Sequence, residues 1–205
     1  MRKVDYFKII QAYIPPKSPA YRIYIIHVTL VTAKALEIAR RLKLTALQLQ
    51  FIEEACMLHD IGIIKVDAPE IGCTGKLPYI CHITEGRKIL EAERLPLHAK
   101  IAENHIGVGG LSRKDITENN LPLPERDILC ETIEEKIISY ADLFYSKNPK
   151  RLFVEKPLKQ VQAKVKKYGK RQEKLFKEWH KLFEGKKEPK PKEVKKSAVL
   201  NKLIE

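Results

Sequence analysis

Long apolar runs are missing from this 205-residue sequence, and none reaches the roughly 18 residues that a helix needs to cross a bilayer. The amino-terminal segment lacks the apolar stretch of a secretory signal peptide. Cysteine is scarce as well, and the four cysteines form neither a CxxC pair nor the dense pattern of a disulfide framework. We therefore expect a cytoplasmic protein with reduced thiols and no membrane partner.

Acidic residues are few in the last part of the chain, and this scarcity accounts for the formal net charge of +13. Residues 1–146 hold 19 basic and 19 acidic side chains, whereas residues 147–205 hold 20 basic and 7 acidic ones. Only Arg151 and Arg171 among those 20 are arginines, so the bidentate contacts with which arginine reads bases are scarce. A lysine field binds polyanions with little selectivity. We therefore favour a solvated helical surface over a nucleic-acid site for this segment.

This uneven charge predicts three parts of the chain. Residues 1–146 form a neutral globular domain, residues 147–185 a basic helical extension that docks on it, and residues 186–205 a mobile lysine-rich tail. Docking is expected because apolar side chains recur at helical spacing within the extension. They form two stripes, one of Leu158, Val161, Val165 and Tyr168, the other of Leu175, Trp179 and Leu182.

Apolar residues also recur at helical spacing through most of the first 146 residues, without a convincing hairpin. Thr45 is a suitable N-cap for one of these helices. Prolines and glycines mark residues 65–81 and 112–126 as loops. The predicted class is therefore all-α, a helical bundle with helices at about 22–42, 45–59, 82–94, 96–105 and 127–146.

Histidines and aspartates occur on these helices in an order that suits metal binding. His59 and Asp60 are adjacent at a helix end, where the backbone leaves helical geometry and both side chains can turn toward one point. A buried aspartate is costly unless a cation or several donors compensate it. Each such residue taken alone has a structural explanation, but their order and context favour a shared site. The other members, on separate helices, are His27, His82, His105 and Asp142.

Four histidines and two aspartates exceed what one tetrahedral ion needs. They suit one or two divalent ions sharing Asp60, with mixed imidazole and carboxylate ligands that favour Mn, Fe, Co, Ni or Zn. His98 and His180 are interpreted as structural, because the first follows a proline in a charged turn and the second lies in the lysine-rich extension.

The series His27, His59-Asp60 and Asp142, with the string His59-Asp60-Ile61-Gly62, resembles the HD-domain superfamily of metal-dependent phosphohydrolases over about residues 22–146. The resemblance implies an all-helical bundle whose core holds a divalent ion on those four residues. His82 and His105 are similar to the extra ligands of two-metal members, such as HD-GYP proteins and the inositol-oxygenase branch.

The chain departs from HD-GYP proteins at two points. A single histidine stands at His105-Ile106, and the string that follows contains no Gly-Tyr-Pro motif. Hydrolysis of cyclic di-guanylate is therefore not expected. The chain is more similar to the small stand-alone HDIG hydrolases, a resemblance that names no substrate.

The predicted function is hydrolysis of a phosphomonoester or phosphodiester by metal-activated water, with a small phosphorylated substrate for which nucleotides are candidates. Asp60, Lys65 and Lys147 are the expected catalytic residues. Asp60 shares the ions, and the two lysines, near the signature residues in sequence, contact phosphate as point charges. Residues 65–81 and 107–126 would form the pocket rim. Two alternatives are a di-iron oxygenase on the same scaffold and a non-catalytic binding module with a structural metal.

Overall fold

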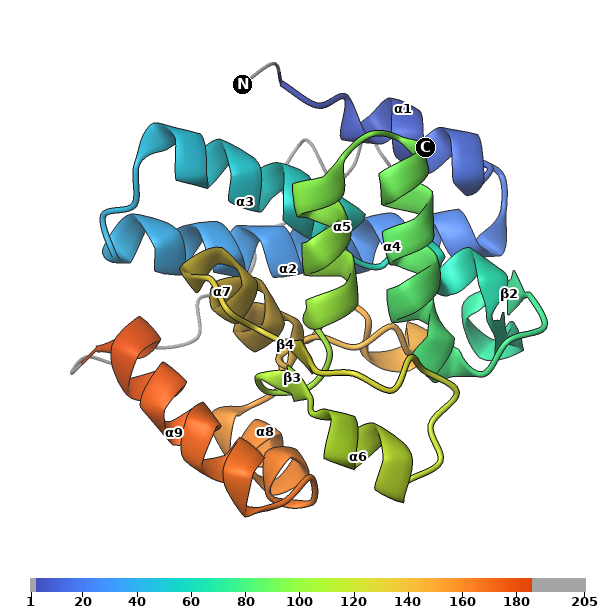
Figure 1. The fold of residues 1–205 in the computed structure, drawn as a ribbon. Helices are drawn as coiled ribbons and strands as arrows, with labels where there is room; N and C mark the ends of the chain where they lie inside the picture. Colours follow the sequence, from blue (N-terminus) through green and yellow to red (C-terminus); the bar gives the residue numbers. More distant parts are fainter. Residues whose placement is uncertain (1–2, 186–205) are drawn as a thin grey trace.

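The computed structural model describes residues 3–185, and within them the chain is mostly helical (Figure 1). This confirms the all-α class. The predicted tail at 186–205 lies outside the described residues. No helix in the described part is long and apolar enough to cross a membrane. The α-helices are α1 (Tyr6–Tyr13), α2 (Pro19–Arg41), α3 (Ala46–Leu58), α4 (His82–Ala92), α5 (Pro96–Asn104), α6 (Arg113–Glu118), α7 (Ile133–Asp142), α8 (Leu158–Lys166) and α9 (Lys170–Glu184).

The long helix α2 is the centre of the bundle, with α3 beside it and α7 packed across it (Figure 1). Helices α4 and α5 pack as a pair, and α5 also contacts α3 and α7. The predicted cap is confirmed, because the Thr45 side chain accepts a hydrogen bond from the Gln48 backbone N–H. Ser18 caps α2 in the same way through the Tyr21 N–H, and Pro19 occupies the first turn.

Two short antiparallel pairs of strands interrupt the helices, where the sequence predicted no hairpin. Each strand has two residues, too few for a period-two pattern to stand out. Gly110 is required in the second pair, because its φ is +78° and an added Cβ would lie 2.0 Å from the Ile128 carbonyl oxygen. The strands are β1 (Asp67–Ala68) with β2 (Cys73–Thr74) and β3 (Gly110–Leu111) with β4 (Ile128–Leu129).

These pairs and the neighbouring caps change two predicted boundaries. The helix predicted at 127–146 begins only at Ile133, because Thr132 caps it through the Glu135 N–H and the preceding residues pair with β3. The predicted loop at 112–126 contains α6, which starts at a reciprocal capping box between Ser112 and Asp115. The remaining short turns are 3₁₀-helices: η1 (Ile61–Lys65), η2 (Pro69–Ile71), η3 (Tyr79–Cys81) and η4 (Pro149–Arg151).

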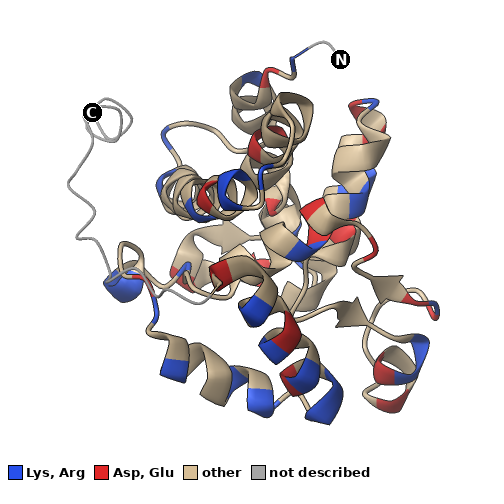
Figure 2. Ribbon diagram, turned by 90° about the vertical axis from the view of Figure 1, so that its left-hand side faces the viewer, with Lys and Arg blue, Asp and Glu red and all other residues tan. Residues whose placement is uncertain are grey.

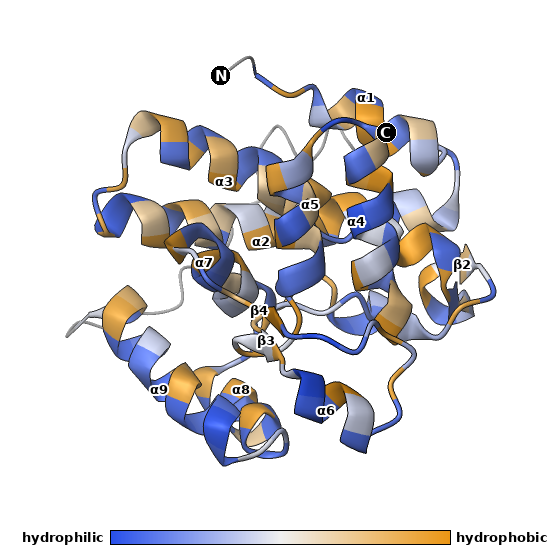
Figure 3. Ribbon diagram, viewed as in Figure 1, coloured by the Kyte–Doolittle hydropathy of each residue, from blue (hydrophilic) through white to orange (hydrophobic). Residues whose placement is uncertain are grey.

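Helices α8 and α9 pack against one another, and α9 also contacts α7 and α2. Hydrophobic and hydrophilic positions alternate along α8 and α9 (Figure 3), and many of the hydrophilic ones are the lysines and arginines coloured blue in Figure 2. Most of the hydrophobic side chains are buried, whereas the lysines are exposed. The predicted stripes are wrong at two positions, since Tyr168 is 46% and Leu182 52% exposed. Trp179 is buried as predicted, but Phe176 and Phe183 complete the inward face of α9 in place of Leu175 and Leu182. The buried apolar side chains of the two helices are Val161, Val165, Phe176, Trp179 and Phe183.

The contact between α9 and α7 is centred on Tyr140. Its hydroxyl lies 2.8 Å from His180 Nδ1, and its ring stacks on Phe176 with centroids 5.5 Å apart. His180 therefore has a structural partner, as its position in the extension predicted. Tyr140 lies two residues before Asp142, the last residue of α7.

Candidate metal centre

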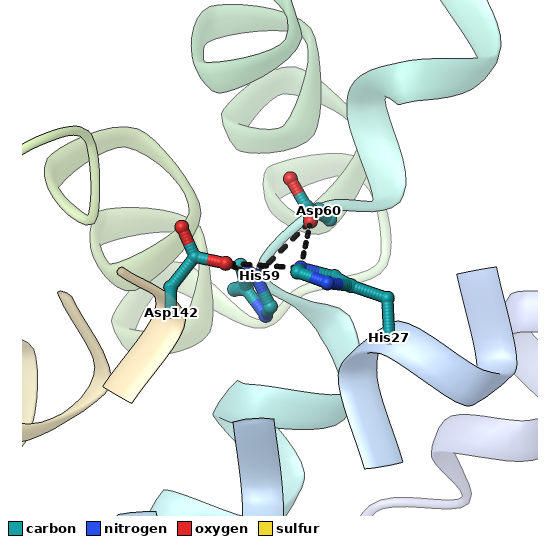
Figure 4. Close-up of side chains that lie close together, drawn as sticks. All are labelled: His27, His59, Asp60 and Asp142. Atoms are coloured by element: carbon teal, nitrogen blue, oxygen red, sulfur yellow. Dashed lines mark ion pairs between the residues drawn. The ribbon is translucent and has the colours of Figure 1, made fainter. Parts of the chain in front are cut away.

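Four side chains from three helices meet in the core of the bundle (Figure 4). His27 comes from the middle of α2, His59 and Asp60 from the end of α3, and Asp142 from the last position of α7. His27 Nε2 lies 3.1 Å from Asp60 Oδ2 and 2.9 Å from Asp142 Oδ1. His59 Nε2 lies 3.1 Å from the same Asp60 oxygen. Ligand atoms of all four are within 4.8 Å of one another, a separation that one ion could span.

A second group forms on the other oxygen of Asp60. Asp60 Oδ1 lies 3.5 Å from His82 Nε2, at the start of α4, and 3.6 Å from His105 Nε2, at the end of α5. These three residues also have ligand atoms within 4.8 Å of one another. Asp60 thus presents one oxygen to each group, which is the arrangement of a carboxylate that could bridge two ions.

Backbone carbonyls hold three of the imidazole rings in place. A carbonyl oxygen can only accept, so Nδ1 of each ring carries a proton and Nε2 is the nitrogen that faces Asp60 and could bind a metal once it is unprotonated. Metal-binding histidines are commonly oriented in this way. The Nδ1 atoms of His59, His82 and His105 lie 2.6, 2.6 and 2.9 Å from the carbonyl oxygens of Cys56, Tyr79 and Ala102.

Several polar atoms of the cluster are buried without a hydrogen bond of acceptable geometry to any described residue. They include Nε2 of His27 and His59, both oxygens of Asp60, and Oδ1 of Asp142. Burying polar atoms without hydrogen bonds is costly, more so when they are charged, and of these atoms only Asp60 Oδ2 has an ammonium group beside it, that of Lys147. Mixed imidazole and carboxylate donors suit a divalent transition metal. The residues present therefore fit a divalent cation, which would satisfy these atoms together.

The charges of the cluster shift its pKa values strongly. Burial lowers the pKa of His59, but the neighbouring Asp60 and Asp142 carboxylates outweigh burial and raise it to about 10. Burial raises the pKa of Asp60, yet the Lys147 ammonium and the His59 imidazole hold it well below its usual range. Without a metal, protonated His59 and Lys147 therefore balance the two carboxylates.

His82 and His105 respond differently, because burial dominates at both. It lowers the pKa of His82 despite the Asp60 carboxylate. At His105, burial and the nearby His59 charge lower the pKa to about 3. Both rings are therefore neutral at physiological pH, the form in which an imidazole binds a metal.

Of the two lysines predicted near phosphate, the structure brings only Lys147 to the cluster. Its Nζ lies 2.5 Å from Asp60 Oδ2, and its side chain is 12% exposed. Lys65 is the last residue of η1 and is exposed, because the 3₁₀ turn after Asp60 carries it away from the core. The expected catalytic role of Lys65 is therefore not supported by its position.

A cavity of about 780 Å³ opens beside the cluster and is lined by His27, His82, Asp142 and Lys147. Residues from both predicted rim segments, 65–81 and 107–126, line it, which confirms that expectation. The sequence did not indicate the lining residues from the extension, because nothing in a lysine-rich helix marks which lysine faces a cavity. They are Asn148, Lys156, Lys164, Lys167, Tyr168 and Gln172.

The two histidines interpreted as structural lie outside this cluster. Buried His98 has its Nε2 3.2 Å from Oε2 of Glu54, and the other Glu54 oxygen accepts from the Val4 N–H at 3.0 Å. This pair joins the amino-terminal segment to α3 and α5.

Comparison with known proteins gives matches of three kinds. Residues 24–146 match the family model for the HD domain. The tRNA (cytidine(56)-2'-O)-methyltransferase of Thermoplasma volcanium is 31% identical over 121 residues, or 58% of this chain and 31% of the relative. The enzyme of the same name from Picrophilus torridus is 32% identical over 94 residues, or 45% of this chain and 24% of the relative. The chain thus spans less than a third of these relatives.

Solved structures of the HD domain of L. monocytogenes phosphodiesterase PgpH are also similar. One is 16% identical with a TM-score of 0.48 and covers 85% of this chain and 94% of its own. The other, in complex with cyclic-di-AMP, is 17% identical with a TM-score of 0.49 and covers 87% of this chain and 95% of its own.

Proposed function

This chain belongs to the HD-domain family, and on that premise we propose that it hydrolyses phosphate esters at the cluster around Asp60. The observation that carries the proposal is the position of Asp60, whose two oxygens face two separate groups of imidazole nitrogens. His27, His59, Asp60 and Asp142 would hold one divalent ion, and Asp60, His82 and His105 a second. When bound, such ions lower the pKa of coordinated water to near 7 and polarise phosphoryl oxygens.

Lys147 would bind the phosphate group that is hydrolysed. It lines the cavity, and its ammonium lies against Asp60. Burial lowers the pKa of Lys147, but the Asp60 carboxylate outweighs burial and raises it above its usual range. Lys147 therefore stays charged, and would both orient the ester and balance the negative charge that develops on its oxygens.

The cavity favours a small organic phosphate of nucleotide size. Its volume lies within the roughly 300–1,000 Å³ typical of small-molecule sites. Tyr79 and Tyr168 line it and offer aromatic faces on which a base could stack. The methyl transfer in the names of the relatives is not proposed for this chain, which spans less than a third of either.

The proposal is tested with purified protein and a panel of nucleoside phosphates and phosphodiesters, with Mn²⁺, Fe²⁺, Co²⁺, Ni²⁺ or Zn²⁺ supplied in turn. We expect release of phosphate or of a nucleoside monophosphate that a chelator stops and added metal restores. Oxygen uptake without phosphate release would instead favour the di-iron oxygenase. Stoichiometric metal with neither activity would favour the binding module.

Metal affinity should depend on pH because of His59. Its Nε2 can bind a cation only after the imidazolium loses a proton, and its pKa is about 10. We expect the affinity for Mn²⁺ to rise by up to about tenfold per unit between pH 7 and pH 9. A histidine with an ordinary pKa near 6.5 would already be neutral in this range. Equal dissociation constants at pH 7 and pH 9, measured by calorimetric titration, would contradict the expectation.

A further inference from the structure

The basic extension contributes part of the cavity wall. Lys156, Lys164 and Lys167 line the same cavity as His82 and Asp142, although all three lie outside the segment that matches the family model. Lys159 and Lys166, which lie on α8 between or beside these lysines in sequence, do not line the cavity. The extension therefore brings positive charge to one defined place, in addition to its general surface charge.

Lys156 is held in position by the chain itself. Its Nζ donates to the backbone carbonyls of Leu143, at 2.9 Å, and of Tyr145, in the turn that follows Asp142. An ammonium group has three donors, so one remains for a ligand in the cavity. Burial lowers the pKa of Lys156 to about 8, although the Asp142 carboxylate acts against burial. The Lys164 and Lys147 ammonium groups also lower the pKa, and a bound anion would offset their like charges.

The three lysines have no carboxylate partner among residues 3–185. Acidic residues do line the cavity, but two of them are engaged elsewhere. Asp142 belongs to the metal cluster, and Asp115 is 3.1 Å from Arg171. Glu70 is the third acidic residue, and four lysines line the same cavity. The cavity outside the metal cluster is therefore positively charged.

The lysines also form a series that leads away from the cluster. Lys147 contacts Asp60, Lys156 is held in the turn that follows Asp142, and Lys164 Nζ is 5.9 Å from the Tyr168 ring centroid. All three lysines and Tyr168 line the same cavity. Several apolar side chains also line the cavity and could receive a base, among them Ile80, Ile106, Leu111 and Leu121.

We propose that Lys156, Lys164 and Lys167 form a second anion subsite, and that the substrate is a nucleotide carrying a second phosphate besides the one that is hydrolysed. The proposal rests on the proposed function for the first phosphate, at Asp60 and Lys147. A substrate with a single phosphate would leave the outer lysines without an anion. The second phosphate can be joined to the first, as in a nucleoside diphosphate, or be on another ribose oxygen, as in a nucleoside bisphosphate. ADP and adenosine 3′,5′-bisphosphate distinguish these two cases.

The test measures binding to the full chain by calorimetry in the presence of a chelator, so that no turnover occurs. The probes are AMP, ADP and adenosine 3′,5′-bisphosphate. The double variant Lys164→Gln/Lys167→Gln is compared with Lys159→Gln/Lys166→Gln, which removes the same charge from the same helix away from the cavity. We expect ADP or the bisphosphate to bind the parent about tenfold more tightly than AMP. That preference should vanish in the first variant and remain in the second.

Two results would overturn the subsite: equal binding of all three probes by the parent, or equal losses in both double variants. Turnover measured separately with Mn²⁺ keeps the two proposals distinct. Lysine-dependent binding without hydrolysis would leave the subsite standing and reject the hydrolase. Hydrolysis with the same KM in the parent and in Lys164→Gln/Lys167→Gln would support the hydrolase and reject the subsite. Both double variants change exposed lysines, so their melting temperatures should match that of the parent.

Discussion

Replacing Asp60 by asparagine is expected to reduce kcat for phosphate-ester hydrolysis by about 1,000-fold or more, equivalent to about 4 kcal/mol. The amide has nearly the same size as the carboxylate but no negative charge, and only its oxygen, not its NH₂ group, has a lone pair to offer a cation or a hydrogen-bond donor. Asp60 faces four imidazole nitrogens through two oxygens. Both groups of donors therefore lose their shared anion, and metal content per chain should fall together with activity.

The matched control is Asp67→Asn, which makes the same chemical change at an exposed position in β1. It should retain full metal content and full activity. Elemental analysis and steady-state kinetics on both variants check the prediction, with circular dichroism to verify that each is folded. An Asp60→Asn protein that keeps its metal and its kcat would show that the reaction centre lies elsewhere.

The second large effect concerns Gly62, the glycine of the His59-Asp60-Ile61-Gly62 string. An added Cβ at this position would lie 2.0 Å from the His82 carbonyl oxygen and 2.3 Å from the Gly86 backbone nitrogen. Both are main-chain atoms of α4, which cannot move aside as a flexible side chain can. Gly62→Ala is expected to lower the free energy of unfolding by about 3 kcal/mol or more, measured by urea denaturation.

Gly86→Ala is the contrasting variant in the same contact. Its Cβ would be 3.3 Å from the Ala102 side chain, and alanine is favoured over glycine within a helix by roughly 0.5–1 kcal/mol. Its stability should therefore stay within about 1 kcal/mol of the parent. If both variants were equally stable, the close approach of η1 to α4 would not explain the glycine of the signature.

Much of the helical framework could be predicted because local physics determines it. The Thr45 cap and the inward face that carries His59 follow from capping and helical spacing. The order of histidines and aspartates predicted a shared site of six residues, and the structure places all six in two groups that share Asp60. That adjacency could not be derived from spacing alone, because His27 and Asp142 are on helices far apart in the sequence.

Lys65 and Lys147 show where sequence distance misleads. Lys65 is nearer to His59 in sequence, but the 3₁₀ turn of η1 leaves it exposed, whereas Lys147 returns to Asp60 after α7 ends. On α9 the sequence predicted Leu182 on the inward face where the structure has Phe183, since both are apolar and only packing selects the latter. A helix in a lysine-rich segment likewise gives no local sign of which lysine faces a cavity.

The stacking of Tyr140 on α9 has a consequence for Asp142, two residues further along α7. Asp142 lies half a turn beyond Tyr140 on one rigid helix, so the rotational setting of its carboxylate is fixed from behind by Phe176 and His180. A chain truncated before Lys170 would retain every histidine and aspartate of the centre, but it would lack the α9 side chains that hold the helix of Asp142 in place. Helix α9, the last helix among the described residues, thus supports from outside a centre whose ligand residues all precede it in synthesis.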